Sequence, residues 1–455
     1  MKKLLEDAAQ RSIAYRSGID KRPVAPGASA IEGLQAFYEE LPESGTNASD
    51  TLTMLDVVGS PAAMAMTGPR FFGFVVGGSM PVSLAANWLA GAWDQNTSMH
   101  HVTPAVSILE RVSTDWMLDI LGLPGNCGSA FVTGATVANF TSLAAARNKV
   151  LQNAGWNVRS DGLFGAPDIH VIVGAEAHPS LLKSLSLLGL GEKRVTTIDV
   201  DEQGRMRADK IPQLSGPTII CTQAGNVNSG AFDPIDDICD MAKEVQAWVH
   251  VDGAFGLWAA ASNEFKANCR GIERADSWAT DAHKWLNVPY DCGLAFVRDA
   301  RALSEAMAIT AHYLITDSDD RNPSDYTPEL SRRARGVEVW AALRTLGRSG
   351  VCEMIERCCR HARRFADELS ASGYDVLNDI VLNQVLVTFR DDETTLRVVA
   401  ALQKDGTCWC GSTVWHGITA MRISVSNWST TDDDVTTSLD AMLRIAREAC
   451  ARTAD

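Results

Sequence analysis

Strands and helices alternate along the middle of this 455-residue chain, and the alternation limits the folds that the chain can adopt. Short apolar runs that read as strands are followed by longer stretches that read as helices. The expected strands are residues 130–132, 169–173, 218–222, 247–252 and 294–297, and the expected helices are residues 139–151, 179–190 and 236–245. Strands that alternate with helices form a mainly parallel α/β sheet, which binds its ligand at the carboxyl ends of the strands.

The final third of the chain predicts a second, smaller domain. Apolar residues recur three and four positions apart in one predicted helix, at Ile355, Cys358, Ala362, Phe365 and Leu369. Strands at residues 383–389 and 421–425 and a helix at residues 432–447 complete an α+β domain. We therefore expect a large domain over residues 71–345 and a small C-terminal domain over residues 346–455.

Composition excludes several classes of function. The formal net charge is −15 and no basic cluster is present, which argues against a nucleic-acid or anionic-membrane partner. The eleven cysteines form no CxxC pair, so we expect no metal site and a reducing compartment, the cytoplasm. The N-terminus does not read as a secretory signal, and residues 1–70 read as helical pieces too thin to form a core. Glycine and proline interrupt the apolar stretch at residues 74–93, which predicts a loop and a buried helix rather than a membrane span.

Two short motifs carry the chemistry of a reactive amine beside a buried carboxylate. Lys284 stands in the apolar stretch Asp281-Ala-His-Lys-Trp-Leu, where desolvation makes a lysine amine nucleophilic toward a carbonyl. Asp252 ends the apolar strand in His250-Val-Asp-Gly-Ala254, and a carboxylate in that position needs a partner. A cofactor that has both an aldehyde and a basic pyridine nitrogen uses both residues. Alternation along the strand puts His250 on the same face as Asp252, where we expect it to pack behind the site.

A third motif, Thr133-Gly-Ala-Thr-Val-Ala-Asn139, is a turn between a predicted strand and a predicted helix. Free amides at a helix N-terminus bind phosphate, and small residues let the backbone approach such a ligand. The motif matches neither GxGxxG nor GxxxxGK[ST], which disfavours a nucleotide-binding α/β protein. Taken alone, the turn fits an ordinary helix start equally well.

Together these motifs resemble the pyridoxal-phosphate-dependent group II amino-acid decarboxylases, relatives of the aromatic amino-acid and glutamate decarboxylases. His250-Val-Asp252-Gly-Ala254 and His283-Lys284-Trp285 carry the resemblance. It implies a fold-type I, aspartate-aminotransferase-like large domain with a mainly parallel seven-stranded sheet. It also implies pyridoxal 5'-phosphate as cofactor and a homodimer with the active site at or near the subunit interface. In such a dimer, residues 1–70 would wrap the partner subunit.

The resemblance also assigns roles to individual residues. The residues that would bind the cofactor are Gly134, Ala135, Thr136, His178, Asn226, Asp252, Ala254, His283 and Lys284. The catalytic residues would be Lys284, His178, Asp252 and Tyr326. Tyr326 belongs to the polar run at residues 316–328, which we expect to be a mobile loop. Within the family, Lys284 would hold the cofactor as an aldimine while an L-amino acid loses its carboxylate as CO2.

The sequence leaves the reaction type and the substrate open. Asp281-Ala-His-Lys284 departs from the Asn-Pro-His-Lys of many decarboxylases and resembles the phosphosphingolipid lyases, which break a carbon–carbon bond. A carbon–carbon or β-elimination lyase, an oxidative deaminase and a catalytically silent binding protein therefore stay as alternatives. Asn226 lies where family members commonly have Gly-Thr-Thr, and Phe74-Val-Val-Gly-Gly78 gives no support for an aromatic substrate. Arg422 suits a substrate carboxylate or a structural ion pair equally well.

Overall fold

The computed structural model describes residues 1–309 and 321–451, which form two compact units. The larger unit comprises residues 79–362 and 378–384. The smaller unit joins residues 1–78 to residues 363–377 and to the C-terminal part of the chain. The expected boundaries at residues 70 and 345 differ from these limits, because the N-terminal segment and the C-terminal domain share one unit. Residues 310–320 and 452–455 lie outside the described residues.

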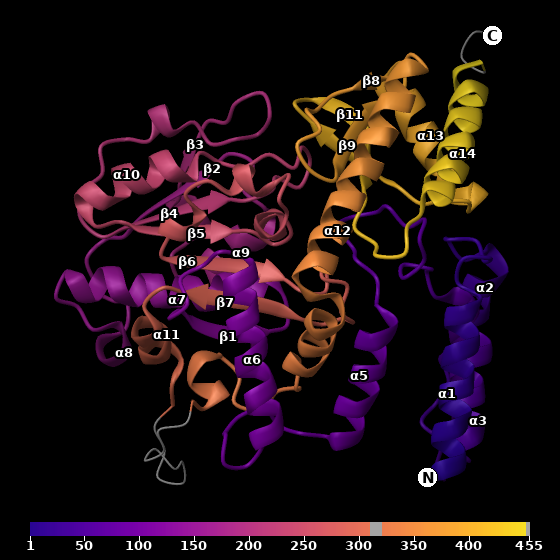
Figure 1. The fold of residues 1–455 in the computed structure, drawn as a ribbon, viewed down its shortest axis with the longest axis horizontal. Coiled ribbons are helices and arrows are strands. Elements are labelled where there is room, and N and C mark those ends of the chain that lie inside the picture. Colours follow the sequence, from indigo (N-terminus) through magenta and orange to yellow (C-terminus); the bar gives the residue numbers. More distant parts are fainter. Residues whose placement is uncertain (310–320, 452–455) are drawn as a thin grey trace. The chain divides into compact units, whose positions relative to one another are not determined.

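The larger unit is built on a seven-stranded sheet with the order β1-β7-β6-β5-β4-β2-β3 (Figure 1). Its strands are β1 (Gly128–Val132), β2 (His170–Gly174), β3 (Thr196–Ile198), β4 (Thr218–Gln223), β5 (Trp248–Asp252), β6 (Ser277–Asp281) and β7 (Gly293–Val297). The strand β2 pairs in parallel with β3 and with β4, and the pairs β4–β5 and β5–β6 are also parallel. The strand β7 runs antiparallel to both β1 and β6. The expected mainly parallel seven-stranded sheet is confirmed.

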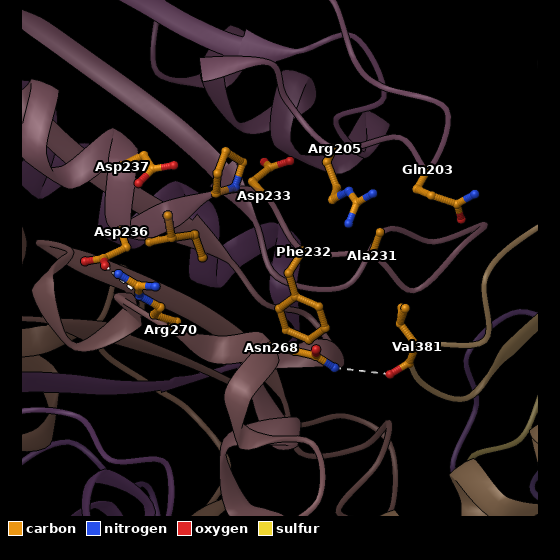
Figure 2. A pocket seen from close by; sticks show the side chains of 12 residues that line it. Gln203, Arg205, Ala231, Phe232, Asp233, Asp236, Asp237, Asn268, Arg270 and Val381 are labelled. Carbon is orange, nitrogen blue, oxygen red and sulfur yellow. Dashed lines mark hydrogen bonds and ion pairs between the residues drawn. The ribbon is translucent and has the colours of Figure 1, made fainter. Parts of the chain in front are cut away.

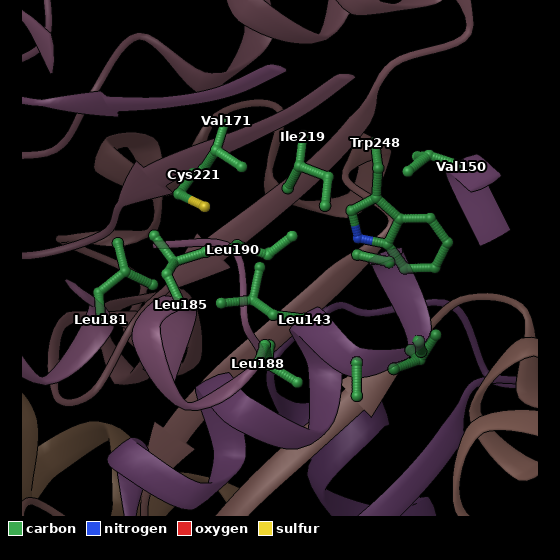
Figure 3. Close-up of a cluster of buried hydrophobic side chains, with 14 of the residues drawn as sticks. Leu143, Val150, Val171, Leu181, Leu185, Leu188, Leu190, Ile219, Cys221 and Trp248 are labelled. Carbon is green, nitrogen blue, oxygen red and sulfur yellow. The ribbon is translucent and has the colours of Figure 1, made fainter. Parts of the chain in front are cut away.

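Several helices of the larger unit pack on this sheet or against the helices that cover it. They are α5 (Pro81–Trp93), α6 (Pro104–Ile120), α7 (Ala135–Asn153), α8 (Val158–Asp161), α9 (Pro179–Leu187), α10 (Ile235–Val245), α11 (Ala300–Met307) and the first part of α12 (Gly336–Ala371). The helix α7 packs across β1 and β4 to β7, with α9 and α11 beside it. Figure 3 shows the core between them, where Leu143 of α7 and Leu185 of α9 approach Ile219 and Cys221 of β4.

Two strands of the sheet, β3 and β6, were absent from the sequence expectations. The strand β6 reads Ser-Trp-Ala-Thr-Asp, and its small and polar residues lack the apolar run that marked the other strands. All five of its residues are nevertheless buried, because β5 and β7 flank it and α7 covers it. Packing from both sides, rather than local preference, makes this segment a strand.

The expectation of a buried helix within residues 74–93 is wrong in one respect. The helix forms as α5, but its only buried residues are Ser83 and Ala86. Trp88, Leu89 and Trp93 are 41%, 54% and 44% exposed. Within this chain the helix therefore packs through its narrow side and leaves a broad apolar face open.

The long helix α12 is interrupted at Gly347, where φ is +60° and ψ is −179°. A side chain is strained at that backbone conformation, so glycine is the residue that permits the break. The interruption divides the helix two residues beyond the expected domain boundary.

The smaller unit contains a four-stranded sheet, β10-β11-β9-β8, covered by two helices. Its strands are β8 (Asp375–Val376), β9 (Gln384–Thr388), β10 (Gly411–Trp415) and β11 (Ile418–Ser424), and its helices are α13 (Asp392–Asp405) and α14 (Asp432–Ala451). The expected strands near residues 383–389 and 421–425 and the last helix are present. This sheet and its helices form the predicted α+β arrangement.

The N-terminal segment forms short helices that pack onto the rest of the smaller unit. They are α1 (Lys2–Ser17), α2 (Ala28–Gly33), α3 (Ala48–Met54) and α4 (Ser60–Ala62), with helical turns at Leu34–Phe37 and Leu55–Gly59. None of these elements contains a buried residue. Val24 donates a backbone hydrogen bond to Gly406, and Arg70 pairs with Asp434 at 3.2 Å. The segment thus has no core of its own, as expected, and its wrapping of a partner stays a prediction.

No helix within the described ranges is long and apolar enough to cross a membrane.

Candidate active site

The predicted site residues follow strands whose carboxyl ends share one edge of the large sheet. Asp252 is the last residue of β5, and Asp281 is the last residue of β6. Gly134 follows β1, and His178 follows β2. Because only β7 runs in the opposite direction, these positions lie at the same edge, where α/β proteins bind their ligands.

Lys284 lies beside the carboxylate of Asp281 in the turn after β6. Its Nζ is 3.1 Å from Oδ2 of Asp281, and the Nε2 of His283 is 3.7 Å from the same oxygen. The Asp281 side chain is 3% exposed and that of Lys284 is 22% exposed. Burial lowers the pKa of His283, whose Nδ1 accepts a hydrogen bond from the amide of Cys292 at 3.1 Å. The amine of Lys284 therefore lies beside the buried carboxylate of Asp281, which a neutral His283 also approaches.

The turn after β1 approaches this group closely because Gly293 has no side chain. Gly293 pairs with Val132 in β1 and with Asp281 in β6. A Cβ on Gly293 would lie 2.5 Å from the Cα of Gly134, a distance that a side chain cannot occupy. A Cβ on Gly134 would itself lie 3.2 Å from the Cε1 of His283. The two glycines thus let the N-terminus of α7 pack against the lysine turn.

The N-terminus of α7 has the features of an anion site. Gly134 is its N-cap, and no side chain caps the helix. Ala135 and Thr136 form its first turn, in which amides have no partner within the helix. A phosphate group at this point accepts hydrogen bonds from such amides and interacts favourably with the helix dipole.

Asp252 is a buried carboxylate with two donors. Its Oδ2 accepts a hydrogen bond from the Nδ2 of Asn139 at 3.0 Å, and its Oδ1 accepts one from the amide of Ala254 at 3.2 Å. Burial raises the pKa of Asp252, while His178, Asn139 and Lys284 act in the opposite direction. A carboxylate in this position is stabilised by a cation, as expected for the partner of a protonated pyridine nitrogen.

Asn139 is the functional residue that the sequence analysis missed. It lies in α7, is fully buried and contacts both Asp252 and His250. Its position one turn after Gly134 is a signal, because a helix that begins at the ligand edge directs its early residues toward the strand ends. His250 packs behind Asp252, as expected, and burial lowers its pKa to about 3.

His178 lies at the same edge as Asp252 and begins α9 as its N-cap. Its Nδ1 is 2.7 Å from the Oγ of Ser180 and accepts a hydrogen bond from the Ser180 amide. The ring is exposed within this chain and lines a small cavity together with Cys221 and Asp252. It caps a helix and also faces the cavity beside Asp252.

Asn226 is buried and engaged by its own turn. Its Nδ2 donates to Oε2 of Glu176 at 2.8 Å, and its Oδ1 accepts hydrogen bonds from the amides of Asn228 and Ser229. These contacts indicate that Asn226 stabilises the turn after β4. Its assignment to the cofactor stays a prediction.

The expected mobile loop at residues 316–328 is wrong for its described part. Residues 316–320 lie outside the described residues, but residues 323–326 form a helical turn in which Pro323 and Ser324 are buried. Arg321 pairs with Glu110 at 3.4 Å and lies 4.4 Å from the ring centroid of Tyr326. These contacts hold the segment in place.

Tyr326 packs against the apolar cluster at β1 and α7. Its neighbours there are Ala130, Val132, Val137, Ala138, Ala279 and Ala295. The sequence pattern did not reveal this packing, because polar residues surround the tyrosine in the chain. Its role as a proton donor stays a prediction.

Two other positions from the sequence lie in the smaller unit. Arg422 is on β11, and burial lowers the pKa of its guanidinium. Phe74 is 61% exposed, and its ring stacks on Trp409 with the centroids 5.8 Å apart.

A separate pocket of about 290 Å³ contains none of the predicted site residues. Figure 2 shows that polar side chains surround it, including Arg205, Asp237 and the ion pair between Arg270 and Asp236. Asp233 also lines it, although its carboxylate is used by the amides of Met206 and Gln223.

The donor set at the strand ends fits pyridoxal phosphate. The uncapped start of α7 suits the phosphate group, and Lys284 suits the aldehyde carbon. Asp252, with its raised pKa, suits a protonated ring nitrogen.

Comparison with known sequences supports this interpretation. A family profile described as the pyridoxal-dependent decarboxylase conserved domain matches residues 41–391. The chain is 26% identical to an aromatic-L-amino-acid decarboxylase of Bacillus atrophaeus over 408 residues, which cover 86% of this chain and 81% of the relative. It is 28% identical to an L-2,4-diaminobutyrate decarboxylase of Rhizobium meliloti (strain 1021) over 454 residues, which cover 92% and 87%.

Solved structures share the fold. The crystal structure of Oryza sativa TDC with PLP and tryptamine has a TM-score of 0.90 at 23% identity and covers 98% of this chain and 97% of its own. Mouse CSAD also has a TM-score of 0.90, at 20% identity, with 98% of each chain covered. With the fold, the donor set and the profile in agreement, the chain belongs to the pyridoxal-dependent decarboxylase family.

Proposed function

We propose that this chain removes the carboxyl group of an L-amino acid as CO2, using pyridoxal phosphate held by Lys284. The observation that carries the proposal is the placement of Lys284 and Asp252 at one sheet edge, beside the uncapped N-terminus of α7. When bound, the cofactor accepts the electrons that a bond at the amino-acid α-carbon releases. The residues of the chain bind it, orient the substrate and control protons.

Asp252 keeps a proton on the ring nitrogen of the bound cofactor. Its two hydrogen bonds, from Asn139 and from the amide of Ala254, leave it fixed as an acceptor. His178, which lines the cavity beside Asp252, would contact the substrate carboxylate and so select the bond at the α-carbon that breaks. Lys284, the amine nearest to the buried carboxylates, returns the proton to the α-carbon. We assign this step to Lys284 because Tyr326 packs into the cluster at β1 and α7.

The substrate is an amino acid whose side chain the fold alone does not define. The relatives differ, since their names specify aromatic amino acids and 2,4-diaminobutyrate. The test is a panel of twenty amino acids and 2,4-diaminobutyrate, scored for product amine by mass spectrometry and for CO2 by trapping. Amine and CO2 in equal amounts support decarboxylation. Aldehyde or keto acid without CO2 would instead support the lyase alternative, because Asp281-Ala-His-Lys284 also resembles the phosphosphingolipid lyases.

Asp281 holds Lys284 in an ion pair in the cofactor-free protein. The Asp281 carboxylate lies 3.1 Å from Nζ, and the amine must leave this contact to attack an aldehyde. Asp281→Asn should therefore speed recombination of the cofactor-free protein with pyridoxal phosphate by about tenfold, the effect of one hydrogen bond to a charged group. Stopped-flow absorbance measures this rate.

A matched control for this variant is Asp299→Asn. Asp299 pairs with Lys149 at 3.2 Å outside the site, so its loss should leave the recombination rate unchanged. If Asp281→Asn recombines at the wild-type rate, the ion pair with Asp281 does not restrain Lys284.

The active enzyme is a homodimer in the cytoplasm. Support for the dimer comes from the exposed apolar face of α5, with Trp88, Leu89 and Trp93, and from Ile108 of α6, which is 50% exposed. Apolar patches of this kind mark protein interfaces, and two-fold symmetric dimers are the most common homo-oligomers. The eleven cysteines are free, which supports a reducing compartment.

Leu89→Asp tests the dimer. A charge at the centre of an apolar interface is costly to bury, so the variant should elute as a monomer at micromolar concentration. Size-exclusion chromatography with light scattering gives the mass. Leu396→Asp is the control, because Leu396 is equally a half-exposed leucine but lies on α13. A dimeric Leu89→Asp protein would show that α5 is not the interface.

A further inference from the structure

Five buried polar side chains form one hydrogen-bonded chain that ends at Asp252. The Nε1 of Trp248 is 2.8 Å from the Oγ of Ser277, which is 2.8 Å from the Nδ1 of His250. The Nε2 of His250 is 2.9 Å from the Oδ1 of Asn139, whose Nδ2 is 3.0 Å from the Oδ2 of Asp252. All five side chains are at most 5% exposed.

The fold builds this chain from three neighbouring elements. Trp248, His250 and Asp252 alternate along β5 and so lie on one face of the sheet. Ser277 begins β6 and pairs directly with His250 in the register of the two strands. Asn139 projects from α7, which packs across both strands. The hydrogen-bonded chain therefore runs the length of β5, about 13 Å at the usual rise per residue.

The direction of each hydrogen bond follows from the carboxylate at the end of the hydrogen-bonded chain. Asp252 only accepts, so the Nδ2 of Asn139 donates to it and the Oδ1 of Asn139 accepts the Nε2 proton of His250. The Nδ1 of the neutral ring is then an acceptor for the hydroxyl of Ser277, whose oxygen accepts a hydrogen bond from the Nε1 of Trp248.

Burial keeps the histidine in this neutral state. The pKa of His250 is lowered to about 3, so at neutral pH the ring has one donor and one acceptor. The ring uses both, because Ser277 supplies its acceptor contact and Asn139 its donor contact. Neutral His250 thus links the hydroxyl of Ser277 to the amide of Asn139.

We infer that Ser277, His250 and Asn139 are positioning residues that hold the carboxylate of Asp252 in one orientation for the ring nitrogen of the cofactor. The inference rests on the proposed function, in which Asp252 contacts that nitrogen. Ser277 does not touch the cofactor site, yet its hydroxyl stabilises the tautomer of His250 that carries the proton on Nε2.

Loss of the Ser277 hydroxyl weakens this arrangement. Without that donor, the Nδ1 of His250 is a buried acceptor that has lost its hydrogen bond, so the tautomer with the proton on Nδ1 costs less. In that tautomer Nε2 accepts, and it competes with Asp252 for the Nδ2 of Asn139. Asp252 is then held less firmly by one of its two donors.

Ser277→Ala, compared with Ser142→Ala, tests the inference. Ser142 of α7 is equally buried, and its hydroxyl donates to the backbone carbonyl of Trp278 in β6, outside the hydrogen-bonded chain. Both variants should lower the melting temperature of the cofactor-free protein by similar amounts. Only Ser277→Ala should weaken pyridoxal phosphate binding, by about threefold to tenfold, as expected for one hydrogen bond between neutral groups. Equilibrium dialysis of the cofactor-free protein measures the dissociation constant.

A conservative variant and a second site separate positioning from packing. Ser277→Thr restores the hydroxyl and should restore the dissociation constant. If Ser277→Ala does not fold, Trp248→Phe serves instead, because it removes a hydrogen-bond donor that holds the Ser277 hydroxyl in place, and it should weaken binding in the same direction. Equal dissociation constants for the wild type, Ser277→Ala and Trp248→Phe would overturn the inference. Failure of the wild type itself to bind pyridoxal phosphate would overturn the proposed function instead.

Discussion

Lys284→Ala is expected to abolish the covalent attachment of pyridoxal phosphate. Borohydride treatment of the wild type should add one pyridoxyl group, and peptide mass spectrometry should locate it on Lys284. The variant should show no adduct. Its amine production should fall by about 10⁴-fold, the upper end of the effect of one acid–base group, because the substitution removes both the nucleophile and the proposed proton donor.

Lys210→Ala is the matched control for this loss. Lys210 is an exposed lysine of the larger unit, outside the strand-end edge, and its replacement should change neither the adduct nor the rate. An adduct that persists in Lys284→Ala would place the reactive amine elsewhere and would remove the basis of the proposed function.

Asp252→Asn is expected to fold and bind pyridoxal phosphate but to lose most of its turnover. The amide fills the same space between Asn139 and Ala254, but it cannot hold a proton on the ring nitrogen by its charge. Breaking a buried charge pair costs about 3 kcal/mol or more. If that loss appears in the transition state, the rate of amine formation falls by at least about a hundredfold.

Asp276→Asn gives the comparison for a buried carboxylate without this role. Asp276 accepts a hydrogen bond from the amide of Val249 at the opposite end of β5, and burial raises its pKa to about 6. Its replacement should affect stability but leave turnover per folded enzyme nearly unchanged. Turnover of Asp252→Asn within a few-fold of the wild type would show that Asp252 does not face the ring nitrogen.

The sequence predicted the sheet and the two central residues for a physical reason. Apolar runs such as β5 are buried on both faces, and the first polar residue after such a run, Asp252, stands at the ligand edge. Lys284 was recognisable because it interrupts apolar residues. The strand β6 carries no such signal, since its burial arises from neighbours that are distant in the sequence.

Other features depended on contacts that no local pattern encodes. Asn139 gains its role from His250 and Asp252, more than a hundred residues away along the chain. The segment around Tyr326 reads as a polar loop, yet Arg321 anchors it by pairing with the buried Glu110. The face of α5 was expected to be buried because it is apolar, whereas within one chain Trp88 and Leu89 are exposed.

The antiparallel strand β7 has a consequence for how the protein is made. The strand β1 is at the edge of the sheet, and its only strand neighbour is β7, which follows it by more than 160 residues. While the ribosome is still adding residues 133–292, β1 has no partner, and loop closure over such a span is slow. The turn at Gly134 takes its final shape only after Gly293 has emerged and paired with Val132. Nascent chains that end before β7 should therefore fail to retain phosphate, although every residue of the phosphate turn has already been synthesised.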